Sequence, residues 1–489
     1  MSDSLAALAN FISRGRGSDD SAARPLLEAL FGERYHKRHH AKGGTGIRDA
    51  LRLGTPDEGE EGVPYAGLIN PDNPPSGPYG GTSVVWFPTR EHGSLLGLGV
   101  GTRGLSPDEG ILTRPGHRRR AEALRRYLAG MGVEAWSKPD PANLSVSVPQ
   151  TAAGRFPGFE KALKRYGHEM YCMALVPGPD GPPLARQVVQ AFFDWYAYER
   201  GWEMMTAYRD ERDELLATLR RDLFAPVTDA QVYDLLKARH FVILQGPPGT
   251  GKTRLAEQVR EQHFSGKGMT IQFHPAITYE DFVVGLSPDI NKEESLRFEV
   301  RPGWLHQACA KASADPYLLI IDEINRADLG KILGEGIYLF EPDEVGKRTV
   351  ELAHPVQGET SFSLPANLYV LGTMNTADRS IASIDLAIRR RFSFINMMPD
   401  RDVIANQGIA LATQFYDRLC DAFLEYAPSD ALDLLPGHSY FLAKDEDELK
   451  KRLRYELIPL LNEYLREGYL GPATTELQAV RDAIEDEVR

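Results

Sequence analysis

The sequence contains few cysteines and no long apolar run, and these absences limit what the chain can be. Its 489 residues include only Cys172, Cys309 and Cys420, which are too few and too scattered for a disulfide framework or a zinc site. No stretch of 18 or more apolar residues is present, and residues 1–10 lack a basic segment followed by an apolar one. We therefore expect no membrane span, no signal peptide and a location in the reducing cytoplasm.

An excess of positive charge is also missing. The 69 Asp and Glu residues outnumber the 56 Lys and Arg residues, which gives a net charge of −13. The charge is unevenly distributed, because residues 1–183 hold 22 basic and 20 acidic side chains, a net of +2, and leave −15 for the remainder. If the chain binds a polyanion such as DNA, the N-terminal part is the part expected to do so.

The most informative stretch present is QGPPGTGKT, at residues 245–253, which follows the apolar run 241–244. It fits G-x-x-x-x-G-K-[ST], a loop whose backbone N–H groups surround phosphate oxygens. Lys252 would reach the β- and γ-phosphates and the Thr253 hydroxyl would ligate Mg²⁺, while the following helix directs its positive dipole end at the anion. The expected nucleotide-binding residues are Gly246, Pro247, Pro248, Gly249, Thr250, Gly251, Lys252 and Thr253.

Two later apolar stretches end in polar side chains. Residues 317–321 lead into Asp322 and Glu323, and residues 368–374 lead into Asn375. Asp322 is placed to hold Mg²⁺ through water, and Glu323 to polarise the water that attacks the γ-phosphate. Asn375 could orient the same water.

Arginines follow the last of the predicted core strands, at residues 389–391. Arg390 and Arg391 suit a finger that reaches a neighbouring subunit's nucleotide and stabilises transition-state charge. Pairing with the acidic surface is the alternative for these side chains.

Composition and periodicity divide the chain into four parts. These are a mixed α/β N-terminal domain at 1–180, a helical connector at 181–224, an α/β core with a parallel sheet at 225–400, and a helical C-terminal domain at 401–489. In the N-terminal part, residues 84–87 and 95–100 indicate two strands joined by a turn.

Two helices of the N-terminal half carry side chains that suit nucleic acid. Residues 117–130 indicate a helix with five arginines on its outer face, which contacts DNA phosphates or is simply solvated. The aromatic side chains of residues 192–198 pack the connector against the core or stack on bases.

Several strings then resemble McrB, the NTP-driven motor of modification-dependent (type IV) restriction systems, whose members belong to the AAA+ class. The strings are GPPGTGKT (246–253), QFHPAITYEDFVVG (272–285), IIDEINRADLGKILGE (320–335), GTMNTADRS (372–380), AIRRRFSF (387–394) and PGHSYF (436–441). The resemblance implies an AAA+ P-loop NTPase core with a helical lid. It also makes Asn375 the sensor residue, makes Asp378 and Arg379 part of the family's signature, and makes Arg390 and Arg391 the finger candidates.

The resemblance carries further expectations about partners. VPYAGLINP (63–71), Gly80, and residues 84–87 and 96–101 are similar to an N-terminal domain of some McrB-type proteins, which implies DNA recognition, including modified DNA. A homo-oligomeric ring, expected to be a hexamer, and a separate McrC-like endonuclease are implied as well. GTP or ATP remains open as the substrate. A MoxR-like protein-remodelling ATPase and a nucleotide-gated binding switch are the alternatives.

Overall fold

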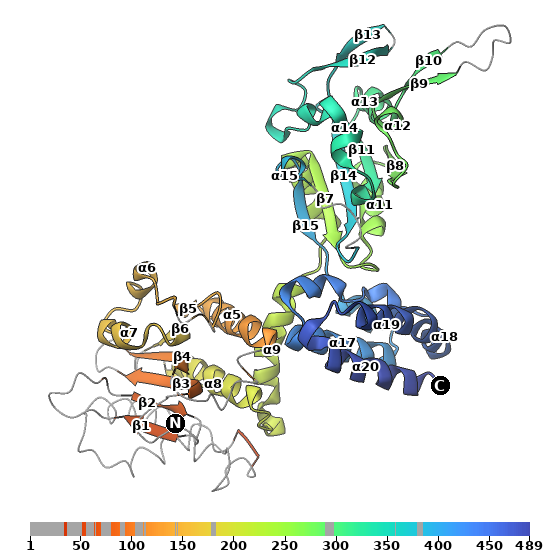
Figure 1. Ribbon diagram of the computed structural model, residues 1–489. Coiled ribbons are helices and arrows are strands. Elements are labelled where there is room, and N and C mark those ends of the chain that lie inside the picture. Colours follow the sequence, from red (N-terminus) through yellow and green to blue (C-terminus); the bar gives the residue numbers. More distant parts are fainter. Residues whose placement is uncertain are drawn as a thin grey trace. The chain divides into compact units, whose positions relative to one another are not determined.

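The computed structural model describes residues 34–36, 51–54, 63, 65–69, 80–88, 93–102, 111, 114–141, 143, 145–177, 182–288, 298–356, 358–378 and 385–489. The chain divides into two compact units (Figure 1), the first Met1–Leu223 with Leu424–Ala427 and the second Phe224–Phe423 with Pro428–Arg489. Among the helices that are described, none has the length and apolar character that crossing a bilayer requires.

An antiparallel sheet forms the centre of the first unit. Its strand order is β1-β2-β3-β4-β6-β5, with β1 Leu51–Gly54, β2 Tyr65–Ile69, β3 Gly80–Pro88, β4 Ser94–Thr102, β6 Met170–Val176 and β5 Ala135–Ser137. Val84 pairs with Leu98 and Trp86 with Leu96 across β3 and β4. The strand pair predicted from residues 84–87 and 95–100 is therefore confirmed.

Helices cover both faces of this sheet, because alternate residues of a strand point to opposite sides. Trp86, Leu96 and Cys172 lie in the core shared with α5, α8 and α9. Their sequence neighbours Phe87 and Leu95 lie in a separate core on the side of α6 and α7. The five helices are α5 Pro115–Gly130, α6 Gln150–Ala153, α7 Glu160–Tyr166, α8 Pro182–Glu199 and α9 Arg209–Leu223.

Helices α8 and α9, which lie within the connector expected at residues 181–224, belong to the first unit. Val188, Phe192 and Trp195 of α8 are at most 1% exposed and lie in the core of the N-terminal sheet. The prediction that these aromatic residues pack against the NTPase core is wrong. Base stacking by Phe192 and Trp195 is also excluded, since both side chains are inside the fold.

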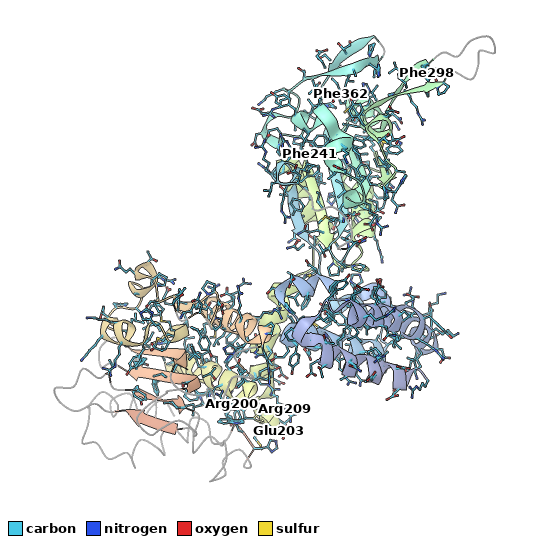
Figure 2. All side chains as sticks on the ribbon, viewed as in Figure 1. Arg200, Glu203, Arg209, Phe241, Phe298 and Phe362 are labelled. Carbon is cyan, nitrogen blue, oxygen red and sulfur yellow. The ribbon has the colours of Figure 1, made fainter. Side chains whose placement is uncertain are left out.

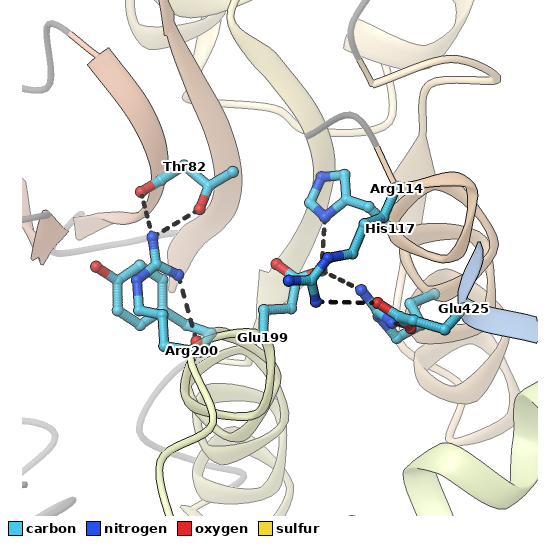
Figure 3. Close-up of polar contacts among 8 residues, drawn as sticks. Thr82, Arg114, His117, Glu199, Arg200 and Glu425 are labelled. Carbon is cyan, nitrogen blue, oxygen red and sulfur yellow. Dashed lines mark hydrogen bonds and ion pairs between the residues drawn. The ribbon is translucent and has the colours of Figure 1, made fainter. Parts of the chain in front are cut away.

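The arginines of α5 were expected on the outer face of the helix, and Arg120 corrects this. Arg120 is 3% exposed and donates to Glu199 at 3.1 Å, and also to Glu425 of the short 424–427 segment. The Glu199 carboxylate also contacts His117 Nδ1 at 2.5 Å (Figure 3). Burial of Arg120 is tolerated because carboxylates accept from it, and such distant partners leave no trace in helical periodicity.

A five-stranded parallel sheet forms the centre of the second unit. Its order is β15-β7-β14-β11-β8, with β15 Ser393–Asn396, β7 Phe241–Gly246, β14 Leu368–Asn375, β11 Tyr317–Asp322 and β8 Gly268–Gln272. In β7, Phe241 and Ile243 lie in one core while Val242 and Leu244 lie in the other. The apolar run 241–244 is thus buried on both faces, as expected for a parallel strand covered by helices on both sides.

Two groups of helices provide these covers. One face is covered by α10 Asp229–Arg239 and α11 Lys252–His263. The other is covered by α12 Tyr279–Phe282, α13 Trp304–Ala312, α14 Leu329–Leu333 and α15 Leu386–Arg389. The parallel sheet with flanking helices predicted for residues 225–400 is confirmed.

Two antiparallel hairpins are added to this core, β9 Val284–Pro288 with β10 Phe298–Pro302, and β12 Val350–Val356 with β13 Glu359–Phe362. Phe298 on β10 and Phe362 on β13 lie on these hairpins (Figure 2). Phe362 is buried, whereas Phe298 is 58% exposed and Leu286 on β9 is 43% exposed.

The remaining helices form the lid. They are α16 Arg401–Ala405, α17 Ala410–Tyr426, α18 Glu446–Arg452, α19 Ile458–Glu467 and α20 Thr474–Glu487. Leu419, Leu453, Leu461 and Leu477 are buried. Cys420 lies in α17, and all three cysteines of the chain are buried.

Candidate functional site

The loop that is expected to bind phosphate, referred to below as the phosphate-binding loop, joins β7 to α11 at the point where the sheet order changes direction from β15 to β14. Gly251 caps α11 with φ 79°, a left-handed conformation that favours glycine. The first helical residue, Lys252, is buried, and its Nζ donates to the carbonyl oxygens of Gly246 at 3.0 Å and Pro247 at 2.7 Å. Its ammonium group thus lies inside the curve of the loop.

The electrostatic surroundings of the Lys252 ammonium group suit the binding of an anion. Burial lowers the pKa of its ammonium group to about 8, while the carboxylates of Glu323 and Asp322 act in the opposite direction. Phosphate oxygens placed in the loop would favour the charged form. The eight residues expected to bind nucleotide, 246–253, form one continuous turn from strand to helix.

Two neighbouring strands bring polar side chains to the same edge of the sheet. In the parallel register, Asn375 of β14 lies opposite Gly246 of β7, and β11 ends at Asp322. Asp322 Oδ1 accepts a hydrogen bond from Thr253 Oγ1 at 2.7 Å. A carboxylate and a hydroxyl are oxygen donors of the kind that Mg²⁺ takes together with phosphate and water, so this pair fits the predicted metal site.

Glu323 lies between the two strand ends. Its backbone is left-handed, with φ 53° and ψ 46°, which is unusual for a residue with a Cβ atom. The Asn375 side-chain amide donates to Glu323 Oε1, and Arg326 Nε lies 3.5 Å from Oε2. Burial raises the pKa of the Glu323 carboxyl group and Asp322 adds to the rise, whereas Arg326 and Lys252 oppose it. A raised pKa suits a group that accepts a proton.

Further residues, to which the sequence patterns assign no role, contact Glu323, Asn375 and Asp322. Arg326 also lies 3.7 Å from Asp378, which connects the loop after β11 to the loop after β14. Asn325 Nδ2 donates to the Asn375 carbonyl oxygen at 3.4 Å, and Thr373 Oγ1 donates to Asp322. Asn325, Arg326 and Thr373 lie inside the sequence strings quoted above. Their closeness in sequence to Glu323 and Asn375 was the one feature that could have pointed to a role for them. Arg379 lies outside the described residues.

The two finger candidates differ in their surroundings. Arg391 is 7% exposed and donates to the Ala387 carbonyl oxygen at 2.6 Å; burial lowers its pKa, and Arg390 adds to the fall. Arg390 is exposed, and within the described part of the chain its side chain has no hydrogen bond or ion pair. It lies near Leu386, which is 81% exposed.

A segment of the lid, residues 437–439, lies directly on the phosphate-binding loop. Gly437 N donates to Pro248 O and Ser439 N to Gly249 O, each at 3.0 Å. A Cβ atom added to Gly437 would overlap the main chain of Gly249. His438 Nδ1 accepts from Asp400 N at 3.2 Å, and burial lowers the pKa of its imidazole. The lid therefore contributes to the walls of the site.

Comparison with known proteins agrees with this geometry. Two family models match the chain, an AAA domain of the dynein-related subfamily over residues 241–392 and the alpha-helical lid domain of McrB over residues 431–470. A solved structure of a candidate ATPase from Cytophaga hutchinsonii is 17% identical and covers 52% of this chain and 68% of that chain, with a TM-score of 0.24 that is too low to bear on the fold.

Two curated proteins are related in sequence. The chain is 26% identical over 189 residues to the type II restriction enzyme BsuMI component YdiS of Bacillus subtilis (strain 168), which covers 31% of this chain and 55% of that protein. It is 32% identical over 351 residues to the type IV methyl-directed restriction enzyme EcoKMcrB subunit of Escherichia coli (strain K12), which covers 65% of this chain and 75% of that protein. The chain therefore belongs to the McrB family of AAA+ nucleoside triphosphatases.

Proposed function

We propose that the chain hydrolyses GTP or ATP at the edge of the sheet where β7, β11 and β14 end. The observation that carries this proposal is that Lys252, Thr253, Asp322, Glu323 and Asn375 converge there from three segments spread over more than 120 residues. Residues 246–253 would hold the triphosphate. Thr253 and Asp322 would hold Mg²⁺, which supplies neutralisation of phosphate charge when bound.

Glu323 is the proposed base for the attacking water. It carries a carboxylate of raised pKa next to the phosphate-binding loop, and the Asn375 amide fixes the direction of that carboxylate. Asn375 would act as the sensor that positions both the carboxylate and the water. Asp378 would act through Arg326, which lies within 4 Å of both acids.

We further propose that the protein is the ring-forming motor of a restriction system. Two related proteins are named as components of restriction enzymes, one of them methyl-directed. Residues 1–180 would recognise DNA, and an McrC-like endonuclease would cleave it. Exposed Arg390 would complete the site of the next subunit in a ring, expected to be a hexamer.

The function is tested by measuring Mg²⁺-dependent release of phosphate from GTP and from ATP, with and without an McrC-like endonuclease. We expect turnover of at least one nucleotide, stimulation by the nuclease, and an oligomer in gel filtration with nucleotide. Failure to hydrolyse either nucleotide under both conditions would refute the NTPase proposal. Turnover without nuclease stimulation or DNA binding would favour a protein-remodelling ATPase.

The contact between the lid and the phosphate-binding loop predicts that Gly437→Ala weakens nucleotide binding at least about tenfold. The added methyl group overlaps the backbone of Gly249, so the two hydrogen bonds to Pro248 and Gly249 must be given up. Equilibrium titration with a fluorescent nucleotide measures the loss. Gly336→Ala is the matched control, because a Cβ atom at Gly336 meets nothing within 4 Å. Equal affinity of both variants and the parent would contradict the prediction.

The exposed face of α7 is the DNA-contacting surface that we propose, in place of the arginine face of α5. Lys161, Lys164 and Arg165 follow the i, i+3, i+4 spacing on α7, and all three are exposed. His168, just after the end of the helix, is exposed as well. On α5, by contrast, Arg125 and Arg126 pair with Glu122, and Arg120 is buried.

Replacing both Lys161 and Lys164 with Glu should weaken DNA binding. It should also make the negative slope of log affinity against log salt shallower by about two. A salt series with the full chain and a DNA duplex measures both quantities. Arg118→Glu reverses one charge on the exposed side of α5, against the two reversed on α7. If that variant has the larger effect, the contact surface is α5 and the assignment to α7 is wrong.

A further inference from the structure

Thr373 is a buried hydroxyl at the centre of the proposed catalytic edge. It lies in β14, two residues before Asn375, and is 2% exposed. Its Oγ1 lies 2.6 Å from Asp322 Oδ1 and 3.1 Å from the Glu323 backbone nitrogen. We propose, building on the hydrolytic function above, that Thr373 is the positioning residue that sets the directions of both neighbouring carboxylates.

The donor and acceptor roles of this hydroxyl are fixed by its partners. The backbone N–H of Glu323 can only donate, so Thr373 Oγ1 accepts from it and directs its own hydrogen at Asp322. Asp322 Oδ1 accepts from Thr253 as well, at 2.7 Å. Two hydroxyl groups therefore hold one carboxylate oxygen, and Oδ2 has no hydrogen bond or ion pair within the described residues. Oδ2 would thereby be left available to a metal-bound water.

The backbone of Glu323 depends on the same hydroxyl. Its left-handed conformation is unfavourable for a residue with a side chain and must be held by the surrounding structure. The Thr373 hydroxyl accepts a hydrogen bond from the backbone N–H of Glu323, and the backbone N–H of Arg326 donates to the Glu323 carbonyl oxygen at 2.8 Å. This turn separates the two adjacent acids, so that Asp322 meets Thr253 while Glu323 meets Asn375. Without the hydroxyl, the turn loses its only side-chain acceptor in the described structure.

The test compares Thr373→Val, which keeps the shape and removes the hydroxyl, with Thr373→Ser, which keeps the hydroxyl. We expect Val to lower kcat about tenfold or more and to raise the Mg²⁺ concentration that gives half-maximal activity, while affinity for fluorescent nucleotide without Mg²⁺ stays within about twofold. Ser should stay within about threefold of the parent in every measurement. A purely structural role would instead lower the melting temperature and nucleotide affinity together.

Two outcomes overturn the proposal. One is a Val variant with the parent's kcat and Mg²⁺ requirement, and the other is a Ser variant as impaired as Val. If Val does not fold, Thr373→Cys replaces it, because a thiol is a much weaker donor than the Ser hydroxyl. Should the parent hydrolyse nothing, the proposed function fails on its own. The positioning role of Thr373 is then tested by the gain in nucleotide affinity on adding Mg²⁺. An equal gain in the parent and in the Val variant overturns that role.

Discussion

Replacing Glu323 with Gln should lower kcat for nucleotide hydrolysis about a thousandfold and leave nucleotide affinity within about twofold. Glutamine keeps an oxygen that can accept the Asn375 amide hydrogen, so the geometry of this edge is retained. What is lost is a carboxylate of raised pKa able to take a proton from the attacking water. Single-turnover release of phosphate and titration with fluorescent nucleotide separate the chemical step from binding.

A matched control for this variant is Glu351→Gln, an exposed position on β12. It removes the same charge from the second unit without touching the catalytic edge. If Glu323→Gln hydrolyses nucleotide within tenfold of the parent, the water is activated by another group, and the assignment of Glu323 is wrong.

Replacing Arg390 with Ala should lower kcat about a thousandfold, comparable to the loss of an arginine finger elsewhere. Arg390 is exposed, and its side chain has no hydrogen bond or ion pair within the described part of the chain, so it is available to reach a neighbouring subunit's nucleotide. Alanine would remove the positive charge that stabilises the transition state there. Arg391 is a poorer candidate for a finger in trans because its guanidinium is buried against Ala387. Steady-state hydrolysis by each single variant measures the difference.

Mixing two inactive variants tests whether Arg390 acts on a neighbouring subunit. Arg390→Ala subunits keep Glu323, and Glu323→Gln subunits keep Arg390. In a mixed ring, a Glu323→Gln subunit can supply its arginine to the site of an Arg390→Ala subunit, so part of the activity should return. No recovery at any mixing ratio, with subunit exchange verified, would show that Arg390 does not act in trans.

The convergence of these side chains at one edge of the sheet could be predicted from sequence because its parts are local. The apolar run 241–244 has to be a strand buried on both faces, and the glycine pattern after it admits one kind of loop. The strands that end at Asp322 and Asn375 are read in the same way. Parallel strands then bring these ends together without further information.

What sequence reasoning missed depends on contacts between distant segments. The burial of Arg120 depends on Glu199, which lies on another helix. Trp195 packs against the N-terminal sheet, whereas helical periodicity indicates only that a residue is buried and not which element buries it. The seat of Gly437 on Gly249 joins segments almost 190 residues apart, and no local pattern encodes such a contact.

The burial of every cysteine has a practical consequence for studying the motor. Reactive thiols need to be accessible and ionised, whereas burial raises the pKa of Cys309 to about 12 and that of Cys172 further. A maleimide dye should find no native target on the folded chain. One cysteine introduced at Leu386, which is 81% exposed and close to Arg390, would then carry the dye alone and report the approach of a neighbouring molecule.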